Sequence, residues 1–284
     1  MEIIDAHIHY WEPATADRPH DEEGLYISEP WVYESVIQEA VAAGVDKITQ
    51  ITPSILGYDN RYSFEIAARH PDRVFGVFAR FDPDPPQIVE RLRALSTQPC
   101  FVGIRFTTRL PVHRSWWDNG TIDKVFDACA RLSVPIAIHY PQGAKRLADV
   151  KRRFPETVLL VDHMALDHVP NPFAHWDDVL ALADLPNLYQ KVSFFPEAAK
   201  VDEEYPFSGA LPRLREIYER YGAGRLIWGS NFPSLPRRGI TYRQAVDFIK
   251  NAPFIPPADM TDIMGGTLAG LIGRMSAERS KRTS

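Results

Sequence analysis

The chain has 284 residues, 45% of them apolar, and its 32 Lys and Arg residues against 37 Asp and Glu residues give a formal net charge of −5. This length suits a single large α/β domain, because barrels of that class run to about 250 residues. The ordinary composition excludes a disordered chain and a collagen-like fibre, and the acidic balance gives no reason to expect a nucleic-acid partner.

The cysteines and the first residues indicate the compartment. Cys100 and Cys129 are too few for a disulfide framework and favour a reducing environment. Residues 1–5 lack the basic region and apolar core of a signal peptide, and no run approaches the ~20 apolar residues of a membrane span. We therefore expect a cytoplasmic protein with no membrane partner.

Short apolar, β-branched runs recur along the chain and predict eight strands, at residues 3–9, 46–52, 73–81, 101–106, 134–139, 157–163, 187–194 and 225–231. Between several of them, apolar residues recur at helical spacing, in residues 32–43, 88–95, 125–132, 179–185 and 211–221. Strict β–α alternation implies parallel strands joined by crossovers, so eight units predict a closed (β/α)8 TIM barrel. An open doubly wound sheet is the alternative.

The rest of the chain completes one domain. Helices near residues 242–249 and 258–272 are expected to close a barrel of residues 1–275, followed by a polar, frayed tail at 276–284. Long polar inserts follow three strands, at residues 10–30, 107–120 and 195–207. Loops after the strands build the active-site face of a barrel, so tryptophans in these inserts can wall a pocket. These tryptophans are Trp11, Trp116 and Trp117, and we predict that Trp11 contacts the substrate.

Polar residues end several of the predicted strands, where barrel enzymes keep their catalytic groups. His7 and His9 end the first strand and share a face, since strand residues two apart do so. Two converging imidazoles can hold a divalent metal such as zinc, although packing explains an isolated His-x-His equally well. His139, His163 and Asn231 end the fifth, sixth and eighth strands. We expect all of these side chains to meet at one mouth.

Charged residues on the same face point to an anionic substrate. Arg105 closes the fourth strand and can grip a carboxylate, or else form an ion pair within the rim. Arg109 and Arg114 add positive charge nearby, and Lys191 on the seventh strand is a similar, weaker candidate for a substrate contact. Asp5 lies a layer deeper, where structural hydrogen bonding is the expected role.

The other histidines and a basic run are predicted to be structural or solvent-exposed. His70 is expected to cap a helix, and the remaining side chains to lie in solvent without a role in the site: His20, His113, His168, His175 and the helix face at residues 151–153.

The order His-x-His, His, His, followed by a polar residue after the last strand, resembles the amidohydrolase superfamily. The closer resemblance is to its amidohydrolase 2 branch of lactonases, decarboxylases and related enzymes. It rests on segments in order along nearly the whole chain: Asp5-Ala6-His7-Ile8-His9, Ala43-Gly44-Val45-Asp46, His70-Pro71-Asp72-Arg73, Val102-Gly103-Ile104-Arg105, Val161-Asp162-His163, Trp228-Gly229-Ser230-Asn231-Phe232-Pro233 and Ile263-Met264-Gly265-Gly266.

The resemblance implies a role for each strand-end residue. His7 and His9 would be metal ligands where a metal is present, and His139 would be a ligand or a substrate contact. His163 would contact the substrate or the attacking water. The family's last position is usually an Asp that binds metal and shuttles the proton of water, but this chain has Asn231.

Two departures from the family weaken the implied metal site. A carboxamide cannot accept a proton at neutral pH, so Asn231 makes His163 the candidate general base. The fourth strand, residues 101–106, has no Lys that could be carboxylated to bridge two metals. We therefore predict at most one divalent ion, zinc or manganese, held weakly by His7 and His9 with help from His139. A metal-free mechanism, in which these imidazoles donate hydrogen bonds, stays open.

These residues predict a hydrolase that attacks a small carboxylate-bearing lactone, or a related carbonyl compound, with an activated water. His163 and Asn231 are the predicted catalytic residues, and the predicted substrate contacts are Arg105, His139, Lys191 and Trp11. The alternatives are a non-oxidative, metal-dependent decarboxylase of an aromatic or unsaturated acid, and a metal-free isomerase or non-catalytic ligand-binding barrel. A homo-oligomer is compatible with each of them.

Overall fold

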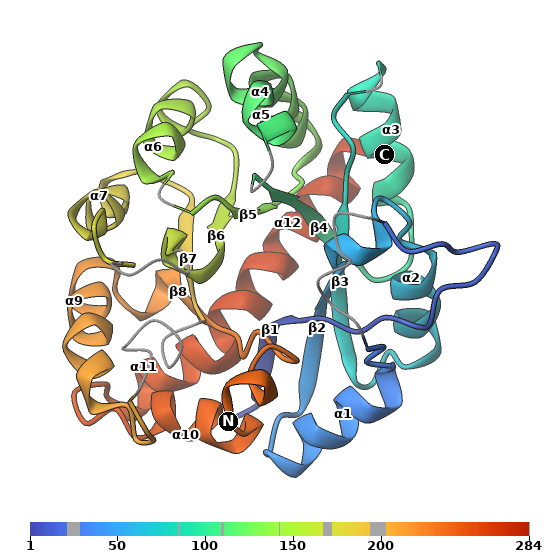
Figure 1. Ribbon diagram of the computed structural model, residues 1–284. Helices are drawn as coiled ribbons and strands as arrows, with labels where there is room; N and C mark the ends of the chain where they lie inside the picture. The colour runs from blue at the N-terminus through green and yellow to red at the C-terminus, as the bar shows by residue number, and fades with distance from the viewer. Residues whose placement is uncertain are drawn as a thin grey trace.

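The computed structural model describes residues 1–21, 29–84, 86–108, 111–141, 143–166, 172–193 and 203–283. Eight parallel strands follow one another around a sheet in the order β1 to β8, and helices surround them (Figure 1). The strands are β1 Ile4–Ile8, β2 Lys47–Ile51, β3 Val74–Arg80, β4 Phe101–Thr107, β5 Ile136–His139, β6 Leu159–Val161, β7 Leu188–Val192 and β8 Leu226–Trp228. Each lies within or almost within a predicted run.

The segment after β8 closes the sheet against β1. The backbone N–H of Asn231 donates to the carbonyl of His7 at 2.8 Å, and the N–H of His9 donates to the carbonyl of Phe232 at 2.8 Å. A parallel bridge joins Ile8 to Phe232. The predicted (β/α)8 barrel is therefore confirmed, and the open sheet is excluded.

Five of the helices lie where helical spacing predicted them, and others follow strands for which no helix was expected. The described helices are α1 Tyr33–Ala42, α2 Arg61–Arg69, α3 Ile88–Ser96, α4 Pro111–Asp118, α5 Thr121–Leu132, α6 Ala144–Arg153, α7 Trp176–Ala181, α9 Leu211–Tyr221, α10 Tyr242–Lys250, α11 Pro257–Thr261 and α12 Thr267–Thr283. None of the helices in these described ranges is long and apolar enough to cross a membrane.

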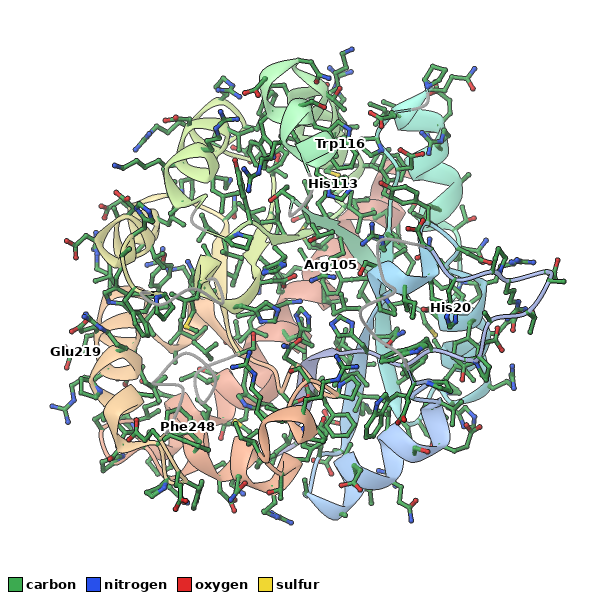
Figure 2. All side chains as sticks on the ribbon, viewed as in Figure 1. His20, Arg105, His113, Trp116, Glu219 and Phe248 are labelled. Atoms are coloured by element: carbon green, nitrogen blue, oxygen red, sulfur yellow. The ribbon has the colours of Figure 1, made fainter. Side chains whose placement is uncertain are left out.

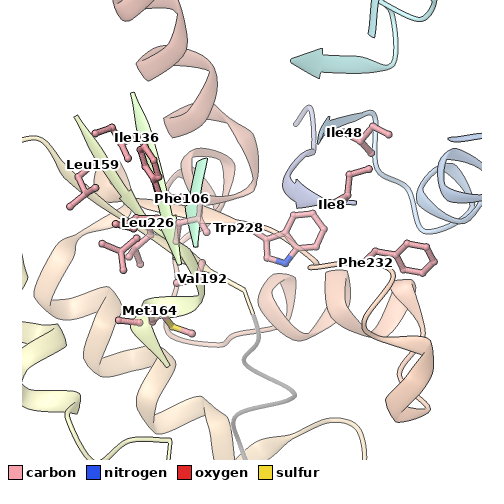
Figure 3. Close-up of a cluster of buried hydrophobic side chains, with 14 of the residues drawn as sticks. Ile8, Ile48, Phe106, Ile136, Leu159, Met164, Val192, Leu226, Trp228 and Phe232 are labelled. Carbon is pink, nitrogen blue, oxygen red and sulfur yellow. The ribbon is translucent and has the colours of Figure 1, made fainter. Parts of the chain in front are cut away.

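Apolar side chains fill the space on both sides of the barrel wall. The outer layer packs the strands against the helices and includes residues drawn in Figure 3, namely Ile8, Ile48, Phe106, Ile136, Leu159, Met164, Val192, Leu226, Trp228 and Phe232. A second cluster joins strand residues such as Phe78 and Leu160 to Leu268 and Leu271 of α12. In Figure 1 this helix crosses behind the strands, so it covers one end of the barrel and leaves the other end for a site.

Two expectations about polar segments were wrong. The segment expected to fray continues α12 to Thr283, because Arg279 holds it: its guanidinium lies 5.4 Å from the ring centroid of Phe101. Lys151 was expected in solvent but is fully buried, and its ammonium donates to the carbonyls of Phe154, at 3.2 Å, and Pro155. In both cases protein groups replace water around the cation: two backbone carbonyls for Lys151, and the aromatic ring of Phe101 for Arg279.

The buried Lys151 gives a stability prediction. We expect Lys151→Ala to lower the free energy of unfolding by about 2 kcal/mol, since the variant removes a charged donor from two carbonyls. Burial lowers the pKa of the Lys151 ammonium to about 8, so part of that loss is offset by relief of desolvation. Urea unfolding at pH 7 measures the difference. Arg152→Ala is the control, since Arg152 is exposed and pairs with Asp149 on its own helix, and it should change stability by less than about 0.5 kcal/mol.

Candidate active site

His7 and His9 present the same ring atom to each other at the end of β1. Their Nε2 atoms are 3.3 Å apart. The Nδ1 atom of His9 lies 2.7 Å from the carbonyl oxygen of Ile51, and the Nδ1 atom of His7 lies 3.4 Å from an Asp162 oxygen. A carbonyl can only accept, so His9 carries its proton on Nδ1 and has the Nε2 lone pair available. Burial, with the Arg105 charge nearby, lowers the pKa of His9 to about 3 and keeps it neutral.

Asp162 is the charged centre beneath these histidines. Its carboxylate lies 3.3 Å from the Nε of Arg105 and 3.1 Å from the Nζ of Lys191, and all three side chains are buried. Burial alone would raise the pKa of the Asp162 carboxyl, but Lys191, His7 and Arg105 together hold it well below its ordinary value. One carboxylate therefore faces two cations, and the carboxyl of Asp5 adds a second negative charge that acts on Lys191.

His163 follows Asp162 and is held by the next strand. Its Nδ1 lies 2.8 Å from the hydroxyl of Ser193, which directly follows β7. Its ring centroid is 4.5 Å from that of His7 and 5.2 Å from that of His139. Burial, then the proximity of His7 and His139, lowers the pKa of His163 well below its ordinary value. The imidazole is therefore neutral at physiological pH and able to accept a proton.

Asn231 stands beside β1 in a left-handed turn, with φ of 59°. Asparagine tolerates this conformation better than most residues. Its backbone bonds His7, and its carboxamide nitrogen donates to the hydroxyl of Ser234 at 2.9 Å. That bond uses one of the two N–H groups, so the amide oxygen suits a metal, a water or a substrate donor, and the second N–H suits a substrate acceptor.

Asp5 has the structural hydrogen-bonding role that was predicted for it, and it joins segments that line the site. One carboxylate oxygen accepts from the backbone N–H of His7 at 2.8 Å and of Ser230 at 3.0 Å, and the other accepts from the hydroxyl of Tyr242. Burial raises the pKa of the Asp5 carboxyl to about 6 in spite of these donors. The contacts hold β1, the turn after β8 and α10 in one arrangement, which positions His7.

Two of the predicted substrate contacts, Trp11 and Lys191, are buried among protein groups. Trp11 is buried in a small cluster with Ile55, Leu56 and Trp31. Lys191 is fully buried, with its ammonium against Asp162 and 4.8 Å from the ring centroid of Phe78. Both remain predictions as substrate contacts, but their described neighbours are protein groups.

His113 corrects the prediction of a solvent-exposed side chain. It lies on α4, is only 3% exposed, and its ring is 4.7 Å from that of Trp116. Figure 2 shows both residues above Arg105. Helix α4 explains the difference, because it turns this part of the insert after β4 inward. Arg109 and His168 lie outside the described residues, and Arg114 is exposed.

Two residues of the cluster received no role from the sequence, Asp162 and Ser193. A signal for Asp162 existed: buried cations need a carboxylate, and Asp162 ends a strand between two strands that carry Arg105 and Lys191. Ser193 gave no comparable signal, because a serine after a strand is common and its partner is 30 residues away in the chain.

The two imidazoles of β1 fit a single metal ion. A tetrahedral ion bound by both Nε2 atoms at about 2.0–2.1 Å needs a separation of about 3.4 Å, close to the observed distance. In the part of the chain that the structure describes, no group of three or more His, Cys, Asp or Glu side chains is placed to share an ion. The involvement of His139 as a third ligand therefore stays a prediction.

The close approach of β8 to β1 gives a second prediction. A Cβ added at Gly229 would lie 2.7 Å from the Cβ of His7, so Gly229→Ala must displace one of the two strand ends. We expect a fall in kcat/KM of about 10²-fold, since a displacement of about 1 Å in a catalytic group has that cost. Gly224→Ala is the control, because a Cβ there meets no atom within 4 Å. Wild-type turnover in the Gly229 variant would contradict this packing.

Two relatives of the chain are lactone hydrolases by name. The chain is 26% identical over 249 residues to L-fucono-1,5-lactonase of Burkholderia ambifaria, covering 81% of this chain and 80% of that protein. It is 24% identical over 238 residues to 4-sulfomuconolactone hydrolase of Hydrogenophaga intermedia, covering 81% and 74%.

Solved structures share the fold over almost the whole chain. An amidohydrolase from Burkholderia multivorans with zinc bound has a TM-score of 0.79 at 18% identity, covering 96% of this chain and 99% of that one. The 5-carboxyvanillate decarboxylase of Sphingomonas paucimobilis has a TM-score of 0.69 at 16% identity, covering 95% and 98%. The family model described as Amidohydrolase matches residues 4–269. With its barrel and its cluster of strand-end histidines, the chain belongs to the amidohydrolase family.

Proposed function

We propose that the protein hydrolyses a small carboxylate-bearing lactone. The observation that carries the proposal is the buried cluster in which neutral His163 lies close to Arg105 and Lys191, the two cations that face Asp162. A cationic surface inside a barrel attracts an anionic substrate, and a neutral imidazole beside it can activate water. Two relatives named for lactone hydrolysis support the reaction class.

The proposed reaction opens the ring by addition of water. His163 takes a proton from water while the water oxygen bonds to the carbonyl carbon. The bond from that carbon to the ring oxygen then breaks, and the imidazolium returns its proton to the leaving oxygen. The product is a hydroxy acid. Arg105 would hold the substrate carboxylate, and its charge would oppose protonation of free His163.

A divalent ion, zinc or manganese, would be held by His7 and His9. When bound, it would polarise the lactone carbonyl as a Lewis acid. The backbone carbonyl of Ile51 and the carboxylate of Asp162 support this assignment, because acceptors beside both Nδ1 atoms leave the Nε2 atoms for the ion. We propose no more than one ion and weak binding, because Asn231 is neutral where the family usually has an anionic ligand. The metal-free alternative needs a proton on an Nε2 atom, and neutral His9 does not supply it, because its one N–H is on Nδ1 against the Ile51 carbonyl.

The role of Asn231 is tested by Asn231→Asp. If Asn231 faces the metal, the variant should bind zinc about 10- to 100-fold more tightly, the range that single changes around metal sites produce. If its amide instead donates to substrate, the variant should raise KM, because a negative charge replaces a donor. Calorimetric zinc titration and steady-state kinetics separate the two readings. Asn187→Asp is a matched control, since Asn187 is also left-handed, with φ of 53°, but is exposed at the start of β7. No change in either quantity would place Asn231 outside the site.

The reaction class is tested by titrating acid release from lactones that carry a carboxylate and from the neutral L-fucono-1,5-lactone. The proposal expects higher kcat/KM for the carboxylates and loss of that preference in Arg105→Gln. Release of carbon dioxide from aromatic or unsaturated acids, without lactone hydrolysis, would favour the decarboxylase. Turnover without either product would favour an isomerase, and binding without turnover would favour a ligand-binding barrel.

A further inference from the structure

Ser193 connects the end of β7 to the imidazole of His163. Ser193 is 2% exposed, and its hydroxyl lies 2.8 Å from Nδ1 of His163. The same hydroxyl donates to the carbonyl oxygen of Lys191 at 3.4 Å. The Ser193 hydroxyl therefore has two described contacts. The Lys191 carbonyl oxygen can only accept a hydrogen bond, whereas Nδ1 of His163 can donate or accept one.

The position of the serine proton decides which nitrogen of His163 is basic. A hydroxyl has one proton, and the Lys191 carbonyl can only accept it. The contact with His163 is then satisfied when Nδ1–H donates to the serine oxygen. In a neutral imidazole, a proton on Nδ1 leaves the lone pair on Nε2.

We propose that Ser193 is a positioning residue that holds His163 as the Nδ1–H tautomer and makes Nε2 its basic atom. The catalytic consequence rests on the proposed lactone hydrolysis, whereas the tautomer itself does not. The Ser193 oxygen would then accept from Nδ1–H of His163, as the Ile51 carbonyl accepts from Nδ1–H of His9. The serine hydroxyl can act as this acceptor because its own proton goes to the backbone carbonyl of Lys191.

Two residues at the end of β7 contact the two consecutive residues that follow β6. Lys191 and Ser193 are two residues apart and share a face, and they contact Asp162 and His163 respectively. His163 itself has φ of 54°, a conformation that is costly for a residue with a Cβ. The backbone thus turns the imidazole into the cluster, and the hydroxyl sets its rotation and its proton.

The tautomer is tested by nitrogen NMR on protein labelled with ¹⁵N-histidine at neutral pH, without added substrate. The chain has nine histidines, and His163→Asn assigns the pair of signals that disappears. We expect Nδ1 of His163 in the protonated range and Nε2 in the unprotonated range. The reverse pattern in the wild-type protein would overturn the proposal, because Ser193 would then donate to the ring. This measurement needs neither a folded variant of Ser193 nor a known substrate.

Ser193→Ala tests the consequence for turnover. We expect a mixture of tautomers in the labelled variant and a fall in kcat of about ten-fold with little change in KM, the size of one lost buried hydrogen bond. Ser63→Ala is the matched control: Ser63 is fully buried and bonds Gln50 and Thr52, so the variant also loses a buried hydroxyl, but away from His163. Unchanged tautomer and kcat in Ser193→Ala would contradict the proposal. The expected tautomer with no lactone hydrolysis in the wild type would contradict the proposed function instead.

Discussion

Replacing His163 by alanine is expected to reduce kcat for lactone hydrolysis by about 10²–10⁴-fold, the usual contribution of a general base. The loss should lie in kcat rather than in KM, because the imidazole acts on water while Arg105 holds the substrate. Steady-state rates of acid release, with the folded state verified by circular dichroism, provide the measurement.

The control for that variant is a histidine outside the cluster. His175 is 47% exposed at the start of α7, where it lies 3.7 Å from Asp178, so His175→Ala should leave kcat unchanged. If His163→Ala retained more than about a third of wild-type turnover, water would be activated by another group, and the proposed mechanism would be wrong.

The acid limb of the pH profile follows from the same residue. Burial lowers the pKa of His163 well below its ordinary value, so the imidazole should keep its proton-accepting form as pH falls from 8 through the ordinary range of histidine titration. We therefore expect a rate that stays level there and falls only at more acidic pH. An exposed imidazole with an ordinary pKa would instead give a rate that rises with pH through this range.

Replacing Asp162 by asparagine is expected to lower the free energy of unfolding by about 3–5 kcal/mol, because it leaves buried cations without their carboxylate. Arg105 and Lys191 lie 3.3 Å and 3.1 Å from that carboxylate, and both side chains are buried, Lys191 completely. Lys191 should respond by losing its proton more readily, since burial already lowers its pKa and Asp162 is the group that opposes this. Urea unfolding measures the loss.

A surface aspartate provides the comparison. Asp149 on α6 is 66% exposed and lies 3.0 Å from Arg152, so Asp149→Asn should change stability by less than about 1 kcal/mol. If Asp162→Asn cost no more than this control, the three buried charges would not depend on one another. The pairing of Arg105 and Lys191 with Asp162, on which the proposed carboxylate site rests, would then be wrong.

Much of the barrel was predictable because its strands leave a local signal. Each is a short apolar run bounded by turn residues, and burial on both faces of a parallel sheet produces such runs. The helices were less regular. Helix α6, Ala144–Arg153, ends in three basic residues, so its buried face is interrupted by Lys151, and helical spacing did not reveal it.

The residue types at the strand ends, and so the family and the candidate general base, were also readable from the chain. Their partners were not. Arg105 meets Asp162 across 57 residues of sequence and His163 meets Ser193 across 30, and these contacts exist only after the strands take their places around the barrel. Charge balance, pKa and tautomer depend on which side chains lie within a few ångströms and on the exclusion of water. The folded barrel determines which side chains are neighbours and which are shielded from water, and the residue pattern of a single strand contains no information on either.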